Sequence, residues 1–427
     1  MKLKSWGRLT EYSVDAQAID SRLSAAKQLK ARPGLAHGAS RSYGDVAVSE
    51  KLWLTHNLDR FVGFDDHTGL LTVEAGVLLG DIQRTFAPRG WMLPVTPGTQ
   101  FVTVGGAIAN DVHGKNHHTA GTFGEQVTRL TLVRTDGSER NCSPLENADL
   151  FKATIGGLGL TGLITEATIQ LKKVSGPWID AETVPFKNLN EFFQLSKASA
   201  DYEYSVAWFD CLSKSGHGIF TRGKHSEATE PLKPSRRLTF AITPPFSLIN
   251  RATLGLLNNA YFLLGLATKG SKTIPYEPFF YPLDGIRHWN RAYGPKGFFQ
   301  HQCVLPEATA PEALQELLTA IRKARAGSLL AVLKTTGERE LPGLMSFGMS
   351  GVTLALDFPN QGDKALKLLA ELEQIVLKHG GRLNPSKDAT MTPEAFAAGY
   401  PNLEKFKQHR DPNINSLFFE RVTERTP

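Results

Sequence analysis

The sequence predicts an α+β protein that is divided into two domains. Its 427 residues exceed what one hydrophobic core usually serves, because single cores stop growing at about 250–300 residues. Glycine is concentrated between residues 98 and 162, in a stretch with little regular periodicity. After residue 177, short apolar strands alternate with amphipathic helices, a pattern that is typical of a sheet covered by helices.

The first half of the chain predicts short elements around one long loop. In order, we expect a helix, a loop, two strands and a short helix at residues 15–31, 34–45, 52–58, 69–77 and 80–90. Residues 93–127 lack periodicity but are rich in Val, Ile, Ala and Phe, so we interpret them as a binding loop rather than a disordered one. A hairpin that turns at Asp136-Gly137, a short helix and a strand follow at residues 127–140, 148–157 and 162–174.

One glycine motif within this half is misleading. Residues 157–162 read Gly-Leu-Gly-Leu-Thr-Gly and match the dinucleotide pattern GxGxxG. That fingerprint has to follow a strand and open a helix, whereas here it follows a predicted helix and precedes a predicted strand. We therefore reject a Rossmann domain, although the glycines still indicate tight backbone beside a ligand.

The second half predicts one sheet with helices. Strands are expected at residues 206–212, 218–223, 296–306, 329–337 and 351–359. Apolar residues at helical spacing predict two helices, around Leu314, Leu317, Leu318 and Ile321 and around Leu369, Leu372 and Val376. The segment from Phe246 to Ala267 is apolar but interrupted by Asn250, Arg251, Asn258 and Asn259, so it predicts a helix that faces lipid or the core rather than a membrane span.

Composition excludes several classes of protein. The net charge of +6 fits a mildly basic surface, and no Lys/Arg run of the kind that binds nucleic acid is present, so we expect no nucleic-acid partner. Cys142, Cys211 and Cys303 are too far apart in sequence for a zinc site or a disulfide framework, and we expect buried thiols and no metal. The first fifteen residues lack the apolar stretch of a signal peptide, so a cytoplasmic or peripherally membrane-associated protein is expected.

Three separated segments carry the chemistry: residues 38–45 (GASRSYGD), 97–118 and 156–162. They are rich in Gly, Ser and Thr, whose turns present backbone N–H groups to a diphosphate such as that of FAD. With the motifs TVGGAIA, HGKNHH, AGTFG, AWFD, WNRAYGP, LDFP and SKD, the chain resembles the FAD-linked oxidases of the vanillyl-alcohol-oxidase and p-cresol-methylhydroxylase (PCMH) superfamily. More narrowly, it resembles the family of decaprenylphosphoryl-β-D-ribose 2′-oxidases.

This resemblance implies a fold and an activity. It implies a PCMH-type FAD-binding domain at residues 1–176, a substrate-binding α+β domain with a mixed or antiparallel sheet at 177–381, and a segment at 382–427 that returns to the FAD domain. The implied reaction is FAD-dependent oxidation of the 2′-hydroxyl of a polyprenyl(decaprenyl)-phosphoryl-β-D-ribose to the 2′-keto sugar. This is the first step of epimerisation to the arabinose donor of the cell envelope. A lipid-linked sugar phosphate as substrate, an NAD(P)H-dependent keto-reductase partner and peripheral membrane contact are implied with it.

The resemblance also implies the residues that contact FAD. They are Ala36, His37, Gly38, Ala39, Ser40, Arg41, Ser42, Tyr43, Gly44, Asp45, Val46, Gly98, Thr99, Thr103, Val104, Gly105, Gly106, Asn110, Asp111, Val112, His113, Lys115, Ile164 and Asn384. Many relatives attach FAD covalently through a histidine of the first loop. Arg41 stands at that position here, and His37 lies four residues earlier, so noncovalent FAD is expected.

Lys387 and His113 are the predicted catalytic residues. Oxidation of a secondary alcohol requires a group that takes the hydroxyl proton. His113 is either that base or a hydrogen-bonding residue, and Lys387 either deprotonates the hydroxyl or stabilises the reduced flavin. The substrate pocket is expected to contain Tyr43, Arg291, Gln300, Gln302, Lys334, Ala355 and Lys387, with Lys334 placed to pair with a phosphate and Arg291 to do the same or to brace a loop.

Two alternative functions and the placement of one segment remain open at this point. The protein is also compatible with a soluble alditol or aldonolactone oxidase of the same superfamily, or with a non-catalytic flavin-binding protein. Residues 225–275 are expected either to cover the prenyl chain, to touch a membrane surface or to pack as a core helix.

Overall fold

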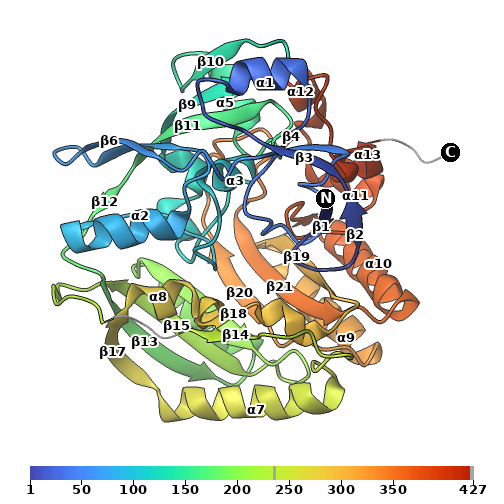
Figure 1. The fold of residues 1–427 in the computed structure, drawn as a ribbon. Helices are drawn as coiled ribbons and strands as arrows, with labels where there is room; N and C mark the ends of the chain where they lie inside the picture. Colours follow the sequence, from blue (N-terminus) through green and yellow to red (C-terminus); the bar gives the residue numbers. More distant parts are fainter. Residues whose placement is uncertain (234–236, 424–427) are drawn as a thin grey trace.

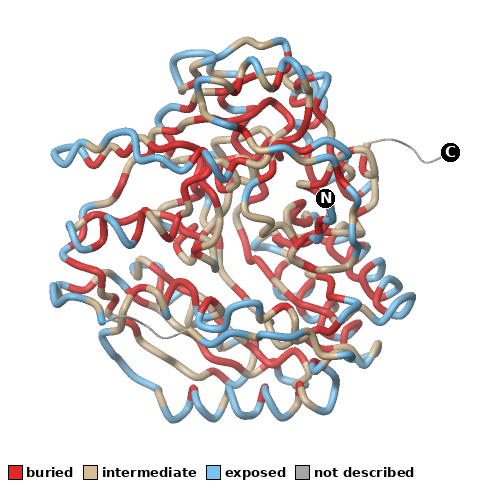
Figure 2. The backbone as a smooth tube through the Cα atoms, viewed as in Figure 1, coloured by how far each residue is buried: buried red, intermediate tan, exposed pale blue. Residues whose placement is uncertain are grey.

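The computed structural model describes residues 1–233 and 237–423, and it confirms the α+β class (Figure 1). Two large sheets dominate the molecule, one of five strands and one of eight. Figure 2 shows the buried backbone running through both sheets and through the loops between them. Across the described ranges, no helix is long and apolar enough to cross a lipid bilayer.

The amino-terminal region contains the five-stranded antiparallel sheet. Its strand order is β10 (Glu139–Cys142), β9 (Val127–Val133), β11 (Leu163–Gln170), β7 (Leu70–Glu74) and β6 (Phe61–Asp65). Beside it lies a parallel sheet of β3 (Asp15–Ala18), β5 (Lys51–Leu54) and β4 (Leu35–His37). Two small antiparallel pairs complete this region: β1 (Lys2–Lys4) with β2 (Glu11–Ser13), and β8 (Trp91–Met92) with β12 (Lys172–Lys173).

Short helices surround these sheets. They are α1 (Ala25–Ala31), α2 (Leu79–Phe86), η1 (Ala87–Arg89), α3 (Val104–Ala109), α4 (His117–Ala120), η2 (Phe123–Gln126) and α5 (Ala148–Thr154). The predicted hairpin forms as β9 and β10, and Gly137 at its turn has φ of +86°. The predicted helix at 15–31 is wrong in its first part, because residues 15–18 form β3 and pair with β5, so tertiary pairing outweighs helix propensity there.

The second half contains an eight-stranded sheet in which every neighbouring pair is antiparallel. Its order is β17 (Gly270–Pro275), β13 (Trp178–Phe186), β15 (Gly218–His225), β14 (Tyr204–Phe209), β20 (Ala331–Thr336), β21 (Gly351–Pro359), β19 (Phe298–Pro306) and β22 (Arg382–Leu383). The strands predicted in this half are all present. The Gly-Leu-Gly-Leu-Thr-Gly motif falls between α5 and β11, as expected for a turn rather than a Rossmann loop.

One face of this sheet is covered by the helices α6 (Leu189–Ala198), α9 (Ala310–Lys323) and α10 (Asp363–Lys378). Leu314, Leu317 and Leu372 from these helices share a core with Leu333 and Leu354 of the strands. The remaining helices of this half are α7 (Arg251–Ala267), α8 (Tyr276–Phe280), η3 (Pro282–Gly285) and η4 (Trp289–Tyr293), with the small pair β16 (Leu238–Thr239) and β18 (Ile286–Arg287). On the opposite face of the sheet, α7 packs against β15 at Ile219, and the rest of that face lines a cavity.

The last segment of the chain packs back on the amino-terminal region. It holds α11 (Pro393–Gly399), α12 (Leu403–Lys407) and α13 (Leu417–Thr423). Phe396 and Phe418 are buried in the same core as Leu35 and Leu52. Arg421 Nη2 also lies 2.9 Å from Asp45 Oδ1 and 3.1 Å from Asp388 Oδ2, so the end of the chain ties two loops together.

Candidate active site

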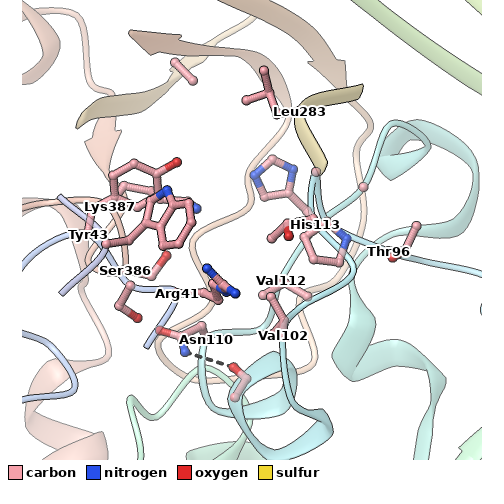
Figure 3. Close-up of a pocket in the computed structure, with 18 of the residues that line it drawn as sticks. Arg41, Tyr43, Thr96, Val102, Asn110, Val112, His113, Leu283, Ser386 and Lys387 are labelled. Atoms are coloured by element: carbon pink, nitrogen blue, oxygen red, sulfur yellow. Dashed lines mark hydrogen bonds between the residues drawn. The ribbon is translucent and has the colours of Figure 1, made fainter. Parts of the chain in front are cut away.

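A cavity of about 750 Å³ lies between the glycine-rich loops of the first half and the face of the eight-stranded sheet that is opposite α6, α9 and α10. Such a volume is within the usual range of ligand sites. Three separate parts of the chain bring polar groups into it: Arg41 and Tyr43 from the first loop, His113 from the long loop, and Lys387 from the tail. Figure 3 shows Lys387 beside Tyr43, with His113 across the cavity from them.

The floor of the cavity is built by alternation along the strands. Side chains two positions apart point to the same face of a sheet. With the exception of Ala207, the cavity-lining residues follow this rule on five adjacent strands: Ile219 and Thr221, Val206 and Trp208, Val332 and Lys334, Ala355, and Gln300 and Gln302. The floor is apolar toward β15 and polar toward β19, so the cavity has two chemically different ends.

A chain of hydrogen bonds fixes the orientation of His113. The backbone N–H of Ser386 donates to Asn384 Oδ1, so the amide Nδ2 of Asn384 donates to Gln302 Oε1 at 3.2 Å. Gln302 Nε2 is then the donor to His113 Nε2 at 3.0 Å, and a neutral His113 carries its proton on Nδ1. Burial, followed by the nearby charge of Lys334, holds the pKa of His113 well below its usual range, which keeps the ring neutral.

Lys387 lies among aromatic and polar groups rather than on a carboxylate. Its Nζ is 4.5 Å from the centre of the Tyr43 ring. Burial lowers the pKa of Lys387 to about 8, and the opposing charge of Asp357 limits that effect. Asp357 itself is fully buried: Oδ1 accepts a 2.6 Å hydrogen bond from Gln300 Nε2, while Oδ2 has no partner among the described residues. Burial raises the pKa of Asp357 to about 7.

Two further lysines are buried around His113. Lys334 Nζ lies 3.4 Å from His113 Nδ1 and donates to the carbonyl of Gly114 at 3.3 Å. Burial, with the charges of Lys115 and Lys387, lowers the pKa of Lys334 to about 7. Lys115 donates to the carbonyl of Phe279, and burial lowers its pKa to about 8. An anionic ligand group would favour the charged forms of these amines.

Comparison with known proteins identifies the family. Residues 15–143 match a family described as an FAD binding domain. Decaprenylphosphoryl-beta-D-ribose oxidase of Mycolicibacterium smegmatis is 35% identical, and the match covers 95% of this chain and 92% of that protein. The chain belongs to the FAD-linked oxidase family of this mycobacterial protein. It is therefore an oxidoreductase with FAD as its cofactor, and the predicted PCMH-type fold is confirmed.

More distant relatives of the oxidase match over shorter lengths. L-gulonolactone oxidase of Mus musculus is 34% identical over 31% of this chain and 30% of its own. Delta(24)-sterol reductase of Homo sapiens is 34% identical over 27% of this chain and 22% of its own. Both matches are confined to about a third of the oxidase or less, so they carry no information on its substrate.

The loops above the cavity fit a bound FAD. A Cβ on Gly38 would lie 2.5 Å from Thr103 Oγ1, and one on Gly106 would lie 2.9 Å from the same atom, so both positions keep the backbone close. At Gly98 nothing lies within 4 Å of that place, which leaves its backbone accessible to a ligand. Asn110 donates to the carbonyl of Gly106, but its Oδ1 is buried without a partner among the described residues. An unpaired buried acceptor and bare backbone suit a ligand rich in polar groups.

Most of the predicted site residues line the cavity. Those brought together there are Ala36, Gly38, Ala39, Ser40, Arg41, Ser42, Tyr43, Val46, Gly98, Thr99, Thr103, Gly105, Gly106, Asn110, Val112, His113, Lys115, Ile164, Gln300, Gln302, Lys334, Ala355, Asn384 and Lys387. Arg41 lies with its guanidinium 4.3 Å from the Trp6 ring and 5.2 Å from the Phe101 ring. The Trp6 and Phe101 rings therefore fix the position of the Arg41 side chain in the first loop.

Six predicted residues lie outside the cavity wall: His37, Gly44, Asp45, Val104, Asp111 and Arg291. Both ring nitrogens of His37 are used, by the carbonyl of Ala47 at 2.7 Å and by Ser40 Oγ at 2.6 Å. Arg291 donates to the carbonyls of Phe240 and Ala241, so it braces a loop and does not reach the substrate pocket.

The other four lie behind the wall for simple packing reasons. Asp45 pairs with Arg421, and Gly44 packs against the carbonyl of Asp388. Val104 is buried in the hydrophobic core of the first half. The carboxylate of Asp111 accepts hydrogen bonds from Ser346 and from the backbone N–H of Gly124.

Sequence reasoning missed several residues of the wall. Trp208 and Tyr261 belong to its apolar end, Phe279 lies against Lys115, and Asp284 accepts from Thr99 Oγ1 at 2.8 Å on the polar side. Asp357, which lies behind the wall and accepts a hydrogen bond from Gln300, was also not predicted, although it follows Ala355 by two positions on the same strand. The period of two along β21 is the signal that identifies it.

Proposed function

We propose that this oxidase converts the 2′-hydroxyl of a polyprenyl-phosphoryl-β-D-ribose to a ketone. The observation that carries the proposal is the two-ended cavity. Its polar end holds Lys334 and Lys387, and its apolar end is formed by Trp208, Tyr261 and Ile219. A sugar phosphate needs cationic and hydrogen-bonding groups, and a prenyl chain needs an apolar wall.

We assign Lys387 as the base of this reaction. Its pKa of about 8 leaves a useful fraction of neutral amine near neutral pH, which a base must have in order to accept the hydroxyl proton. Bound FAD would supply the acceptor for the hydride of the carbinol carbon, and Lys387 would take the hydroxyl proton that the oxidation releases. The Tyr43 ring beside Nζ and the charge of Asp357 position and tune the amine.

His113 acts in this proposal as a positioning residue. Its Nε2 already accepts from Gln302, and Nδ1 carries the ring proton, so neither nitrogen is suited to take a proton from the substrate. Lys334, held beside His113, binds the phosphate. FAD is held noncovalently by the loops at residues 36–46, 97–115 and 158–164, because Arg41 replaces the linking histidine and His37 is fully hydrogen-bonded.

The organisation of the chain and its partners belong to the same proposal. The FAD-binding domain comprises residues 1–176, the substrate-binding domain 177–381, and the segment 382–427 returns to the first. The 2′-keto product requires a hydride-donating reductase, of the NAD(P)H-dependent class, to complete epimerisation. Because the substrate carries a lipid, we also propose that the oxidase works in peripheral contact with a membrane.

Anaerobic bleaching of the flavin tests this function. The purified holoenzyme is mixed with polyprenyl-phosphoryl-ribose, and the loss of the yellow absorbance of FAD is followed by stopped flow. We expect bleaching by this substrate and none by soluble polyols or aldonolactones. Bleaching only by soluble polyols would instead support the alditol-oxidase alternative, and no bleaching by any sugar alcohol would support a non-catalytic flavin protein.

A further inference from the structure

Helix α7 differs from an ordinary surface helix because its solvent-facing side carries large apolar side chains. Its large side chains Leu256, Leu257, Leu263, Leu264 and Leu266 are all exposed. We call these five residues the outer face of α7. A helix on a globular protein normally turns its apolar face to the core and its polar face to water. Figure 2 shows the outer side of this helix as exposed along its length.

The inner face of α7 explains how the helix is held without those leucines. Asn258 is buried and donates from Nδ2 to Asp210 Oδ1 at 2.7 Å. Gly265 is also buried, and a Cβ there would lie 2.3 Å from Ile219 Cδ1, so the backbone packs directly on β15. Leu254 is buried as well, and the Phe262 ring packs 4.4 Å from that of His217, so the inner face holds the helix without the more exposed leucines of the outer face.

The exposed apolar surface is concentrated around this helix. Of seventeen exposed large hydrophobic side chains in the described part of the chain, eleven lie between residues 238 and 286. Phe246 and Leu248 belong to them and directly precede the helix. Apolar side chains scattered singly over a surface need no explanation, but a cluster of this size marks an interaction site.

The charge around α7 favours an anionic partner. Residues 237–296 contain seven Lys or Arg and two acidic residues. Both acids face inward: Glu277 is paired with Arg237, and Asp284 is buried against Thr99 and Gln100. Arg251 at the start of the helix, and Lys269 just after its end, are exposed. Leucines flanked by basic residues are typical of helices that lie in the interface of an anionic bilayer.

The cavity connects this surface to the site. Tyr261 of α7 lines the apolar end of the cavity, and its ring centre lies 4.6 Å from that of Trp208 on the floor. Ile219, which contacts Gly265 of the helix, lines the cavity as well. The apolar end of the cavity therefore lies directly beneath α7, where a lipid chain leaving a bilayer would have the shortest path to it.

We propose that the outer face of α7 inserts into the headgroup region of an anionic lipid bilayer and brings the apolar end of the cavity to the membrane. The occupant is the bilayer rather than a protein, because the outer face offers apolar area and basic flanks but few hydrogen-bonding groups. This proposal rests on the proposed function only for its purpose, namely delivery of a lipid-linked substrate. The binding itself follows from the surface.

Flotation with lipid vesicles tests the proposal without any substrate. The holoenzyme is mixed with vesicles of phosphatidylcholine alone or of phosphatidylcholine with phosphatidylglycerol, and the bound fraction is read from the yellow absorbance. We expect binding to the anionic vesicles. The double variant Leu263→Gln/Leu264→Gln should lose about tenfold or more of the vesicle affinity, because two apolar side chains no longer enter the bilayer.

A matched control is available at the other end of the molecule. Leu145 is 98% exposed and lies between β10 and α5, far from α7 in Figure 1. Leu145→Gln should float with anionic vesicles like the wild type, and all proteins should keep their FAD content and melting temperature. Wild-type protein that does not float, or a double variant that floats equally well, would overturn the proposal.

Further outcomes distinguish membrane binding by α7 from a dimer interface and from the proposed substrate. If the wild type is a dimer in solution that the double variant dissociates, the outer face is a protein interface and the proposal is wrong. Vesicle binding without bleaching by polyprenyl-phosphoryl-ribose would leave the membrane contact in place and reject the proposed substrate. Bleaching by a detergent-solubilised substrate without vesicle binding would do the reverse.

Discussion

Replacing Lys387 by methionine separates the catalytic use of its amine from the cost of burying it. Methionine has a similar length and no charge, so the cavity wall keeps its shape. The variant should bind FAD and fail to bleach with substrate, with the rate of bleaching lowered by about 100-fold or more, as is usual on loss of a catalytic base. The same variant should be more stable than the wild type.

The size of the effects on the bleaching rate and on stability follows from the environment of the Lys387 amine. Burial lowers the pKa of Lys387 from the ordinary 10.5 to about 8. At pH 7 this raises the neutral fraction of the amine from about 0.03% to about 10%, a gain of roughly 300-fold in usable base. The same lowering of the pKa corresponds to a destabilisation of up to about 3 kcal/mol while the amine is charged.

The lowered pKa of Lys387 also fixes how stability and the bleaching rate change with pH. Because the folded-state pKa lies below the unfolded one, the unfolded chain binds more protons between pH 8 and 10.5. Wild-type stability should therefore gain the Lys387 contribution as pH rises through this range, and Lys387→Met should lack that gain. The bleaching rate of the wild type should rise with pH and level off above about 8.

Two measurements check the reasoning: stopped-flow bleaching from pH 6 to 10, and thermal melting at matched FAD saturation. Lys334→Met is the control, since it removes a second buried amine that we assign to phosphate binding. It should raise KM and leave a substantial kcat. If Lys387→Met bleaches at the wild-type rate, or the wild-type profile is flat from pH 6 to 10, Lys387 is not the base.

Three shorter predictions follow from other contacts of the site. Asp357→Asn removes a carboxylate charge that supports the protonated amine, so the inflection of the bleaching profile should move to lower pH, and an unchanged inflection would contradict the coupling. Arg421→Met leaves Asp45 and Asp388 without their cation and should cost about 1–3 kcal/mol in chemical denaturation, because Arg421 is partly exposed and Asp388 keeps its backbone hydrogen bonds; an unchanged stability would contradict the role of this ion pair. Acid precipitation should release all the FAD into the supernatant; yellow pellet would show a covalent link.

Much of the fold was predictable because its signals are local. The hairpin at residues 127–140 is predicted by the alternation of apolar and polar residues and by the turn sequence Asp136-Gly137. Helices α9 and α10 carry apolar residues at helical spacing. The error at residues 15–18 has the opposite origin. Their strand exists because it pairs in parallel with residues 51–54, a contact that no local pattern announces.

In the site, too, some features have local sequence signals and others depend on contacts between distant segments. The glycine loops are continuous in sequence, so the sequence predicts most of the residues that line the cavity on the side of the first half. The chain from Asn384 through Gln302 to His113 joins three distant segments, and only the fold reveals that it occupies the imidazole. For α7, the sequence of residues 246–267 predicts a helix that faces lipid or the core. Only the burial of Asn258 and Gly265 decides which side faces outward.

The ion pair between Asp45 and Arg421 has a consequence for biosynthesis. These residues are 376 positions apart, so the first loop of the cofactor site leaves the ribosome long before the residue that ties it down. Arg421 also holds Asp388, the neighbour of Lys387. The loop that contains Asp45 is thus translated well before the segment that secures it. Termination of translation before residue 421 would leave both Asp45 and Asp388, the neighbour of Lys387, without the cation that holds their loops.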